Sequence, residues 1–370
     1  MRPKTKVLFF IESLGGGGAE KILFTIAKSI DRKKFDVTVA TVIAEGVYAD
    51  RISKLVKFKP LMEIHNRLLY KILYHLIYFY LPLKLVYRFF FPKGYDVEIA
   101  FCEGFATKLL SFSTNKRKIA WVHTDMLHNP WTQSHIYSSI DEEKRVYSKY
   151  DQIICVSETV RESVKTKFGI EADTIYNPID CDEIIEKSKE KIPLPVKRKI
   201  RFVTIGRLVE QKGYDRLLKV VKSLKNERDN FELWILGEGP EKEKLIEYID
   251  KNNLNDCVKM WGFASNPYPY LVVSDVFVCS SRSEGYSTAA TEAIILGLPV
   301  ITTLCSGMKE LLGENRYGII VENKEEALFE PLKKILFESD YLAILTRKAQ
   351  ERSNDFKISS LMKPIEELLI

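Results

Sequence analysis

Cysteine and histidine are scarce in this chain, and neither forms a recognisable metal or disulfide pattern. The 370 residues include six cysteines, scattered between Cys102 and Cys305 without a CxxC pair. Scattered single cysteines are typical of reduced thiols in a cytoplasmic protein. Among the five histidines, His128 and His135 have no ligand-like spacing, so we expect no zinc site.

Long apolar runs are also missing, because charges interrupt each one well short of the ~20 residues of a membrane-spanning helix. Val7–Ile11 follows basic residues but is too short for a signal peptide and runs into Glu12, so we expect a first strand there. The aromatic-rich segment Arg67–Phe91 has two interpretations. It is either a basic helix that lies on an anionic membrane or a pair of core helices with snorkelling basic side chains.

Charge is distributed unevenly along the chain. Residues 1–180 hold 27 Lys and Arg against 20 Asp and Glu, whereas the remainder holds 29 against 30. No nucleic-acid-binding motif accompanies the basic first half, so we expect no nucleic-acid partner. An anionic membrane surface or a lipid diphosphate fits this charge better.

Strands alternate with helical stretches, which predicts parallel sheets covered by helices on both faces. The expected strands are Lys6–Ile11, Phe35–Val42, Val97–Phe101, Lys118–Val122 and Gln152–Val156, followed by Ile200–Ile205, Glu232–Leu236, Val258–Trp261, Val276–Cys279, Pro299–Thr302 and Gly318–Val321. The Lys-, Glu- and Pro-rich residues 181–199 are the expected linker between a domain of residues 1–180 and a domain of residues 200–345. Residues 346–370 are expected to form a terminal amphipathic helix.

Glu284 and Glu292 lie eight residues apart in a loop that enters a helix. Ser287 and Thr288 offer hydroxyls for the N-cap, and free backbone N–H groups at a helix start suit an anion. The backbone at Gly285, Tyr286, Ser287 and Thr288 could therefore face a phosphate. Glu284 could then hold sugar hydroxyls, and Glu292 a ribose diol; alternatively, the two acids are ordinary surface residues at a helix start.

A second motif, Gly206 to Gly213, follows the strand Ile200–Ile205 and precedes a helix near Tyr214. Ligands bind at such strand-to-helix turns in open α/β sheets. Arg207 offers a planar fork for phosphate oxygens, and Lys212 a mobile point charge. Together they could neutralise a departing diphosphate.

These two motifs resemble the donor-site signature of the family 4 glycosyltransferases, which are retaining enzymes. The resemblance covers nearly the whole chain and is strongest in residues 200–322. It implies the GT-B fold, in which two Rossmann-like, doubly wound parallel-sheet domains face each other across a cleft and the terminal helix returns to the first domain. It also implies that the nucleotide base lies near Gly262 and Phe263, which could equally be a turn glycine and a core aromatic.

The glycine-rich loop of residues 14–20 includes Gly17 and Gly18, and small residues let a ligand approach the backbone. Glu20 occupies the place of the third glycine of a dinucleotide fingerprint, which disfavours an NAD-dependent oxidoreductase. The resemblance instead places this loop near donor and acceptor. It also implies that His123, at the end of a strand, faces the reacting sugar, although a lone histidine is often structural.

The expected function is transfer of a hexose or N-acetylhexosamine from a nucleotide diphosphate sugar, with UDP favoured. The expected catalytic residues are His123, Arg207, Lys212 and Glu284. Relatives that build capsule or lipopolysaccharide suggest a lipid-linked acceptor at the inner face of the plasma membrane. A small-molecule or protein acceptor, or a non-catalytic nucleotide-sugar-binding protein, remains an alternative. We expect no cofactor and no metal, because Arg207 and Lys212 supply positive charge and Asp180-Cys-Asp182 is interpreted as a hinge turn.

Overall fold

The computed structural model describes residues 3–62, 81–197 and 199–370 of the chain. The chain divides into two compact units, residues 1–179 with 359–370 and residues 180–358. The segment Arg67–Phe91, interpreted above as a membrane-bound helix or as core helices, lies mostly in residues 67–80, which are outside the described residues. Among the described residues, no helix is long and apolar enough to cross a membrane.

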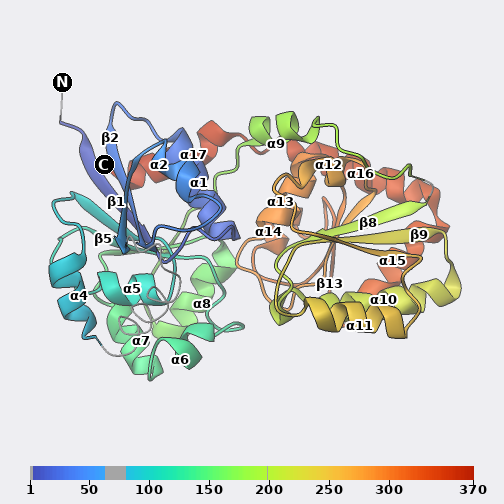
Figure 1. Cartoon of the computed structure of the whole chain (residues 1–370), viewed down its shortest axis with the longest axis horizontal. Helices are drawn as coiled ribbons and strands as arrows, with labels where there is room; N and C mark the ends of the chain where they lie inside the picture. The colour runs from blue at the N-terminus through green and yellow to red at the C-terminus, as the bar shows by residue number, and fades with distance from the viewer. Residues whose placement is uncertain (1–2, 63–80, 198) are drawn as a thin grey trace. The chain divides into compact units, whose positions relative to one another are not determined.

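The first unit is built on a parallel sheet in the order β3-β2-β1-β4-β5-β6-β7. Figure 1 labels β1, β2 and β5 of this sheet. The central strands are mostly apolar and buried, as expected for a sheet covered on both faces. The strands are β1 Thr5–Ile11, β2 Phe35–Ile43, β3 Lys57–Met62, β4 Val97–Ala100, β5 Lys118–Val122, β6 Gln152–Cys155 and β7 Asp173–Thr174. The sequence does not predict β3 and β7, which lie at the two edges of the sheet.

Helices connect these strands and cover the sheet. They are α1 Gly18–Ser29, α2 Ala49–Ser53, α4 Leu83–Phe90, α5 Phe105–Leu110, α6 Trp131–His135, α7 Ile140–Tyr147 and α8 Glu158–Phe168. Side-chain caps mark where two of them begin: Ser139 accepts from the N–H of Glu142, and Ser157 from the N–H of Val160.

The second unit repeats the plan with a parallel sheet in the order β10-β9-β8-β11-β12-β13. Its strands agree closely with the sequence prediction: β8 Ile200–Ile205, β9 Phe231–Leu236, β10 Val258–Gly262, β11 Val276–Cys279, β12 Val300–Thr303 and β13 Ile319–Val321. The helices are α9 Cys181–Ser188, α10 Tyr214–Glu227, α11 Lys242–Lys251, α12 Tyr268–Val272, α13 Thr288–Ile295, α14 Met308–Leu312, α15 Phe329–Phe337 and α16 Ser339–Ser353. Short 3-10 turns occur at Glu210–Lys212 and Glu326–Leu328.

Two segments differ from the sequence prediction. Residues 181–199 begin with a helix, α9, which the side chain of Asp180 caps by accepting from the N–H of Glu183, and which packs on α12 and α13. The expected single terminal helix is broken after α16 by the polar turn at Asn354, and α17 Ile358–Leu368 follows. In the first unit, α17 is held by Glu366, which accepts from the N–H of Asp31 at 3.0 Å.

Each sheet has one point where the strand order reverses. In the first sheet this point lies between β1 and β4, and in the second it lies between β8 and β11. The loops that leave two neighbouring parallel strands in opposite directions open a crevice at their carboxyl ends. The fold therefore brings residues 206–213 beside residues 280–287, and residues 12–17 beside residues 101–104.

Candidate functional site

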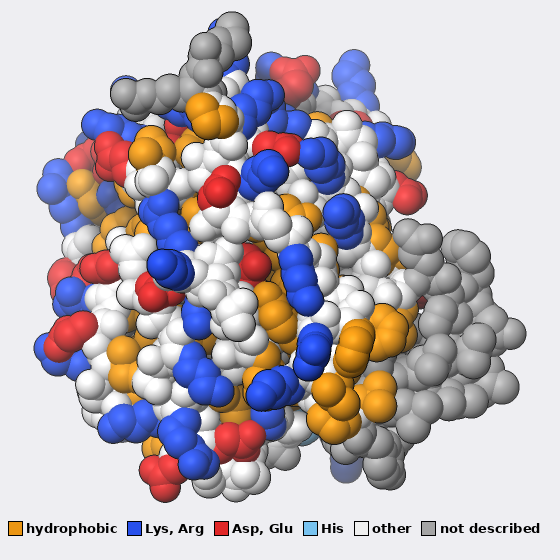
Figure 2. Space-filling view, turned by 90° about the vertical axis from the view of Figure 1, so that its left-hand side faces the viewer, with side chains coloured by type: hydrophobic (Ala, Val, Ile, Leu, Met, Phe, Trp, Pro, Cys, Tyr) orange, Lys and Arg blue, Asp and Glu red, His pale blue; other side chains and the backbone are white. Residues whose placement is uncertain are grey.

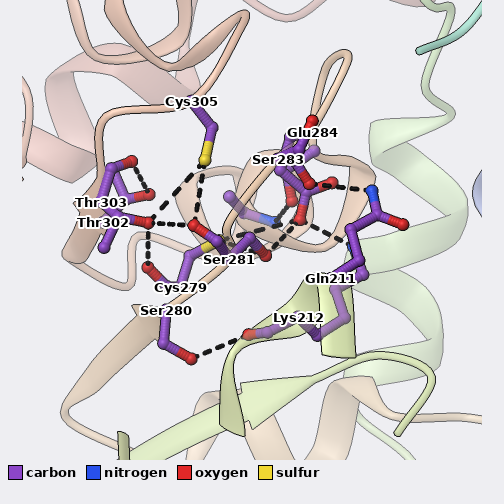
Figure 3. Close-up of polar contacts among 12 residues, drawn as sticks. Gln211, Lys212, Cys279, Ser280, Ser281, Ser283, Glu284, Thr302, Thr303 and Cys305 are labelled. Carbon is purple, nitrogen blue, oxygen red and sulfur yellow. Dashed lines mark hydrogen bonds and ion pairs between the residues drawn. The ribbon is translucent and has the colours of Figure 1, made fainter. Parts of the chain in front are cut away.

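The two loops at the reversal point of the second sheet are joined by hydrogen bonds (Figure 3). The N–H of Arg282 donates to the carbonyl of Gln211 at 2.7 Å, and the Gln211 amide donates to the carbonyl of Ser283 at 2.8 Å. The hydroxyl of Ser280 donates to the carbonyl of Lys212 at 2.9 Å. The loops after β8 and β11 therefore form one structural element.

Gly213 lies where these loops approach most closely. Its φ is +64°, and a Cβ placed on it would lie 2.1 Å from the carbonyl oxygen of Ser280. Both the left-handed backbone and the lack of space require glycine. The closing glycine of the Gly206–Gly213 motif is thus needed for the contact between the loops.

Lys212 and Glu284 form an ion pair across the same boundary. Lys212 Nζ lies 2.7 Å from Glu284 Oε1, and the side chains are 23% and 8% exposed. Burial opposes the charged form of Lys212, but the charge and hydrogen bond of Glu284 outweigh it, so the pKa of Lys212 is raised. Lys212 is therefore a cation held in place by Glu284, and not the mobile charge expected from the sequence.

The carboxylate of Glu284 is oriented by residues that the sequence analysis did not identify. Ser281 donates its hydroxyl to Glu284 Oε1 at 2.6 Å. The carbonyl of Ser281 in turn accepts from the Thr303 hydroxyl at 2.6 Å and from the Cys305 thiol at 3.1 Å. These supporting residues come from the end of β12 and the loop after it, so no local motif could have indicated them.

A small pocket opens beside this ion pair, at the start of α13. Its lining includes Lys212, Tyr214, Ser281, Glu284 and Ser287. Ser287 is the N-cap of α13 and accepts from the N–H of Ala290, whereas Thr288 is the first helical residue. The pocket therefore combines a cation, a carboxylate and the positive end of a helix.

The other predicted residues of this unit are not among those that line this pocket. Arg207 is exposed, and its guanidinium forms no ion pair within the described part of the chain. Glu292 is buried within α13, and Gly285 and Tyr286 precede its cap. Gly206 follows β8 and Gly262 ends β10, on either side of Gly237, whose N–H donates to the Gly262 carbonyl at 2.7 Å. Phe263 follows with 58% of its side chain exposed, so it is not a core aromatic.

In the first unit, the glycine-rich loop follows β1 at the reversal point. Gly17 is the N-cap of α1, which begins at Gly18, and as a glycine it has no side chain of its own for a cap. Gly18 is exposed. The Glu20 carboxylate lies at this helix start, because a Cβ placed on Gly17 would lie 2.5 Å from Glu20 Oε2.

His123 follows β5 in the same unit, half-buried against aromatic rings. Its ring centroid lies 4.8 Å from that of Phe101 and 6.3 Å from that of Trp121. Nε2 is buried without a hydrogen-bond partner among the described residues. Burial lowers the pKa of His123 to about 3, so the imidazole is neutral at physiological pH.

Glu103 holds the backbone at His123 and was not identified from the sequence. Its buried carboxylate accepts from the N–H of His123 at 3.0 Å and from the hydroxyl of Thr124. Glu103 lies in the loop after β4, beside β5 in the sheet. This loop and the glycine-rich loop leave the two strands that flank the reversal point.

The described residues contain no group of three or more His, Cys, Asp and Glu side chains that could hold a metal ion. His128, one of the histidines considered for zinc, instead pairs its Nδ1 with Asp125 Oδ2 at 2.9 Å. Asp180 and Asp182 belong to the start of α9, as described above.

Comparison with known proteins identifies the family. The model of Glycosyltransferase Family 4 matches residues 16–183, and that of Glycosyl transferases group 1 matches residues 185–352. The chain is 28% identical over 366 residues, 95% of each protein, to a Campylobacter jejuni enzyme. That enzyme is N-acetylgalactosamine-N,N'-diacetylbacillosaminyl-diphospho-undecaprenol 4-alpha-N-acetylgalactosaminyltransferase. The present chain is also 32% identical over 120 residues to the lipopolysaccharide core biosynthesis glycosyltransferase LpsD of Rhizobium meliloti. This match covers 32% of this chain and 34% of LpsD.

The fold agrees with that of solved structures. The Anabaena protein HepE in complex with UDP superimposes with a TM-score of 0.77 at 18% identity, covering 99% of both chains. Two parallel-sheet α/β units, matched by the two family models over almost the whole length, confirm the resemblance inferred from the motifs. The chain belongs to the family 4 glycosyltransferases, which have the GT-B fold.

Proposed function

We propose that this chain is a retaining glycosyltransferase that moves a hexose or N-acetylhexosamine from a nucleotide diphosphate sugar, with UDP favoured. The acceptor is a lipid-linked oligosaccharide in surface polysaccharide biosynthesis, and the enzyme works at the inner face of the plasma membrane. The observation that carries the proposal is the Lys212–Glu284 ion pair at the start of α13. A cation suited to a diphosphate and a carboxylate suited to sugar hydroxyls are therefore neighbours, which supports the proposal.

The roles of the donor-binding residues follow from their chemistry. Lys212 and the exposed Arg207 neutralise the diphosphate, and the backbone N–H groups from Gly285 to Thr288 bind its distal phosphate. Glu284 binds hydroxyls of the transferred sugar, and Glu292 the ribose. Gly206, Gly262 and the exposed ring of Phe263 contact the nucleoside.

The first unit contributes residues near the reacting groups. The backbone at Gly17 and Gly18 approaches the donor, and neutral His123 forms a hydrogen bond with the sugar through Nε2, which has no other partner among the described residues. Groups positioned in this way stabilise the transition state most strongly where water is excluded.

The transfer step breaks the bond between the anomeric carbon and the diphosphate oxygen, and forms a bond from that carbon to the acceptor oxygen. The acceptor hydroxyl gives its proton to the departing diphosphate on the same face of the sugar. An α-linked donor therefore gives an α-linked product. Lys212 and Arg207 supply the positive charge at the leaving group, so the step requires no metal ion.

The acceptor is proposed from the relatives and from the charge of the first half of the chain. The Campylobacter jejuni relative is named for an undecaprenol-linked acceptor, and the Rhizobium meliloti relative for lipopolysaccharide core synthesis. An excess of Lys and Arg in residues 1–180 suits a lipid diphosphate. A small-molecule or protein acceptor is the alternative, and a non-catalytic nucleotide-sugar-binding protein would transfer nothing.

The test is a transfer assay in the presence and absence of EDTA. The donors are UDP-glucose, UDP-galactose and their N-acetylated counterparts, and the acceptors are undecaprenyl diphosphate-linked oligosaccharides and free oligosaccharides. Mass spectrometry detects the added sugar, and proton NMR of the new anomeric centre reports its configuration. We expect an α-linked product that forms in EDTA and only with the lipid-linked acceptor.

The variant Arg207→Ala should reduce transfer, and the matched variant Arg347→Ala, at an exposed arginine on α16, should not. A β-linked product would contradict retention, and activity that EDTA abolishes would contradict metal independence. Transfer to free oligosaccharides alone would favour the alternative acceptor. UDP binding without transfer to any acceptor would favour the non-catalytic alternative.

A further inference from the structure

One face of helix α4 exposes large apolar side chains of a kind that is ordinarily buried in a water-soluble protein. Leu85 and Phe89 are four residues apart, so they share one face of the helix, and they are 47% and 70% exposed. Leu81, two residues before the helix begins, is 45% exposed. Phe90 adds another ring, 64% exposed, at the end of the helix. Figure 2 shows orange hydrophobic side chains gathered beside blue basic ones on this side of the molecule. Exposed apolar groups of this kind mark interaction surfaces.

The opposite face of α4 is fixed to the core of the first unit. Val86 and Tyr87 are buried, and the Tyr87 hydroxyl donates to Ser113 Oγ at 2.9 Å. The rings of Tyr87 and Phe91 stack at 4.9 Å, and Phe91 packs edge-on against Phe10 of β1 at 5.0 Å. The helix therefore cannot turn its exposed face inward without losing these contacts.

The charges around the apolar face have one sign. Residues 81–95 contain Lys84, Arg88 and Lys93 and no acidic residue. All three basic residues are exposed, and none forms an ion pair with another described residue. Lys84 and Arg88 are four residues apart, so they form a basic stripe beside Leu85 and Phe89. Their positive charge complements an anionic partner.

We propose that the exposed face of α4 inserts into an anionic lipid bilayer. Leu85, Phe89 and Phe90 enter the boundary between headgroups and acyl chains, while Lys84, Arg88 and Lys93 contact lipid phosphates. The role of this surface rests on the proposed function, because membrane binding would bring the enzyme to a lipid-linked acceptor. The binding of α4 to lipid does not itself depend on that function. The proposed surface is smaller than the Arg67–Phe91 segment, for which the sequence left a membrane-bound helix and a pair of core helices as alternatives.

Vesicle co-sedimentation of the full chain tests the proposal. The vesicles are phosphatidylethanolamine with phosphatidylglycerol, compared with phosphatidylcholine alone. We expect wild type to bind the anionic vesicles, and Phe89→Ser/Phe90→Ser to lower the partition coefficient about tenfold or more, the loss expected when a large apolar side chain is no longer buried. Lys84→Gln/Arg88→Gln should lower anionic binding about fivefold per charge, with a smaller effect at high salt.

Matched variants separate this surface from general stickiness. Phe337→Ser removes a ring of similar exposure, 52%, from α15, and Lys222→Gln/Lys251→Gln removes two exposed lysines from the second unit. Neither should change vesicle binding. Thermal melting checks that every variant is folded.

A second readout measures insertion itself. Brominated acyl chains quench tryptophan that enters a bilayer, so Phe89→Trp should gain fluorescence that these lipids quench, and Phe337→Trp should not. Wild type that binds no vesicle, serine variants that bind normally, or a chain that dimerises through this face in size-exclusion experiments would overturn the proposal. The α4 variants should bind UDP as tightly as wild type does. Wild type that does not bind UDP would contradict the proposed donor site, but it would leave the membrane-binding proposal unaffected.

Discussion

Lys212 Nζ on the loop after β8 lies 2.7 Å from Glu284 Oε1 on the loop after β11. This ion pair links the two sequence motifs that are 72 residues apart. Each partner compensates the charge of the other, and the carboxylate is buried while the ammonium is largely buried. A nucleotide diphosphate sugar would give both groups new partners, the diphosphate for the ammonium and hydroxyls for the carboxylate.

The first prediction concerns the stability of this pair. Glu284→Gln leaves the Lys212 ammonium without its counter-charge, and we expect the free energy of unfolding in urea to fall by about 2–3 kcal/mol. The double variant Lys212→Met/Glu284→Gln should recover more than half of that loss, because no uncompensated charge remains. The control is Glu325→Gln, which breaks the more exposed Lys219–Glu325 pair and should cost less than about 1 kcal/mol. Equal losses for the single and double variants would show that the charges are not coupled.

The second prediction concerns the close approach of the loops. Gly213→Ala places a Cβ against the Ser280 carbonyl at a positive φ, so the loops must separate. We expect a loss of more than about 2 kcal/mol in stability, together with loss of UDP binding.

Gly94→Ala is the control for Gly213, because Gly94 also has a positive φ, +91°, but has nothing within 4 Å of its Cβ position. It should cost about 1–2 kcal/mol and leave UDP binding intact. If Gly213→Ala binds UDP as well as Gly94→Ala does, the junction of the loops is not part of the donor site.

The third prediction is a pH dependence that originates at His123. Its pKa of about 3 in the folded chain lies below the unfolded value of about 6.5, so the unfolded chain binds the extra proton between these values. The stability contributed by neutral His123 is complete above pH ~6.5 and is lost as the pH falls toward 3. At pH ~5 the loss should reach at most about 2 kcal/mol relative to His123→Gln.

Histidine NMR gives an independent measurement of the same group. The imidazole resonance that disappears in His123→Gln should not titrate between pH ~5 and ~8, the range in which an ordinary histidine does. Titration of that resonance near pH ~6.5 would mean that the ring is solvated and not held against Phe101.

The fourth prediction concerns the exposed ring of Phe263 at the end of β10. Phe263→Ala should weaken UDP binding about tenfold or more, the loss typical of a base that stacks on an aromatic ring. Stability should change little, because the side chain is 58% exposed. Phe337→Ala is the matched control, with 52% exposure and no expected effect on UDP. Equal affinities of the two variants would exclude Phe263 from nucleoside binding.

The sequence predicted the central strands of both sheets because these are mostly apolar and rich in β-branched and aromatic residues, as in Val276–Cys279. It did not predict β3, whose Lys57-Phe58-Lys59-Pro60 pattern is poor for a central strand but acceptable at an edge, where proline needs no partner. The broken terminal helix was also not predicted, because α16 and α17 are both amphipathic and only the turn at Asn354 separates them.

The candidate site likewise contains some residues that the sequence predicted and others that it did not. Arg207, Lys212 and Glu284 were found because each lies in a local motif beside a strand end. Ser281, Thr303 and Glu103 were not, since their roles depend on partners brought near by the sheets. The roles of all these residues in binding a donor stay predictions until they are measured.

The most direct test of the donor site is isothermal titration of UDP into wild type and Lys212→Met in the presence of EDTA, with Arg347→Ala as control. We predict that wild type and Arg347→Ala bind equally and that Lys212→Met binds about 10–100 times more weakly, the loss expected for a charged hydrogen bond to phosphate. Unchanged UDP affinity in Lys212→Met, or wild type that does not bind UDP, would contradict the assignment of this ion pair to the donor diphosphate.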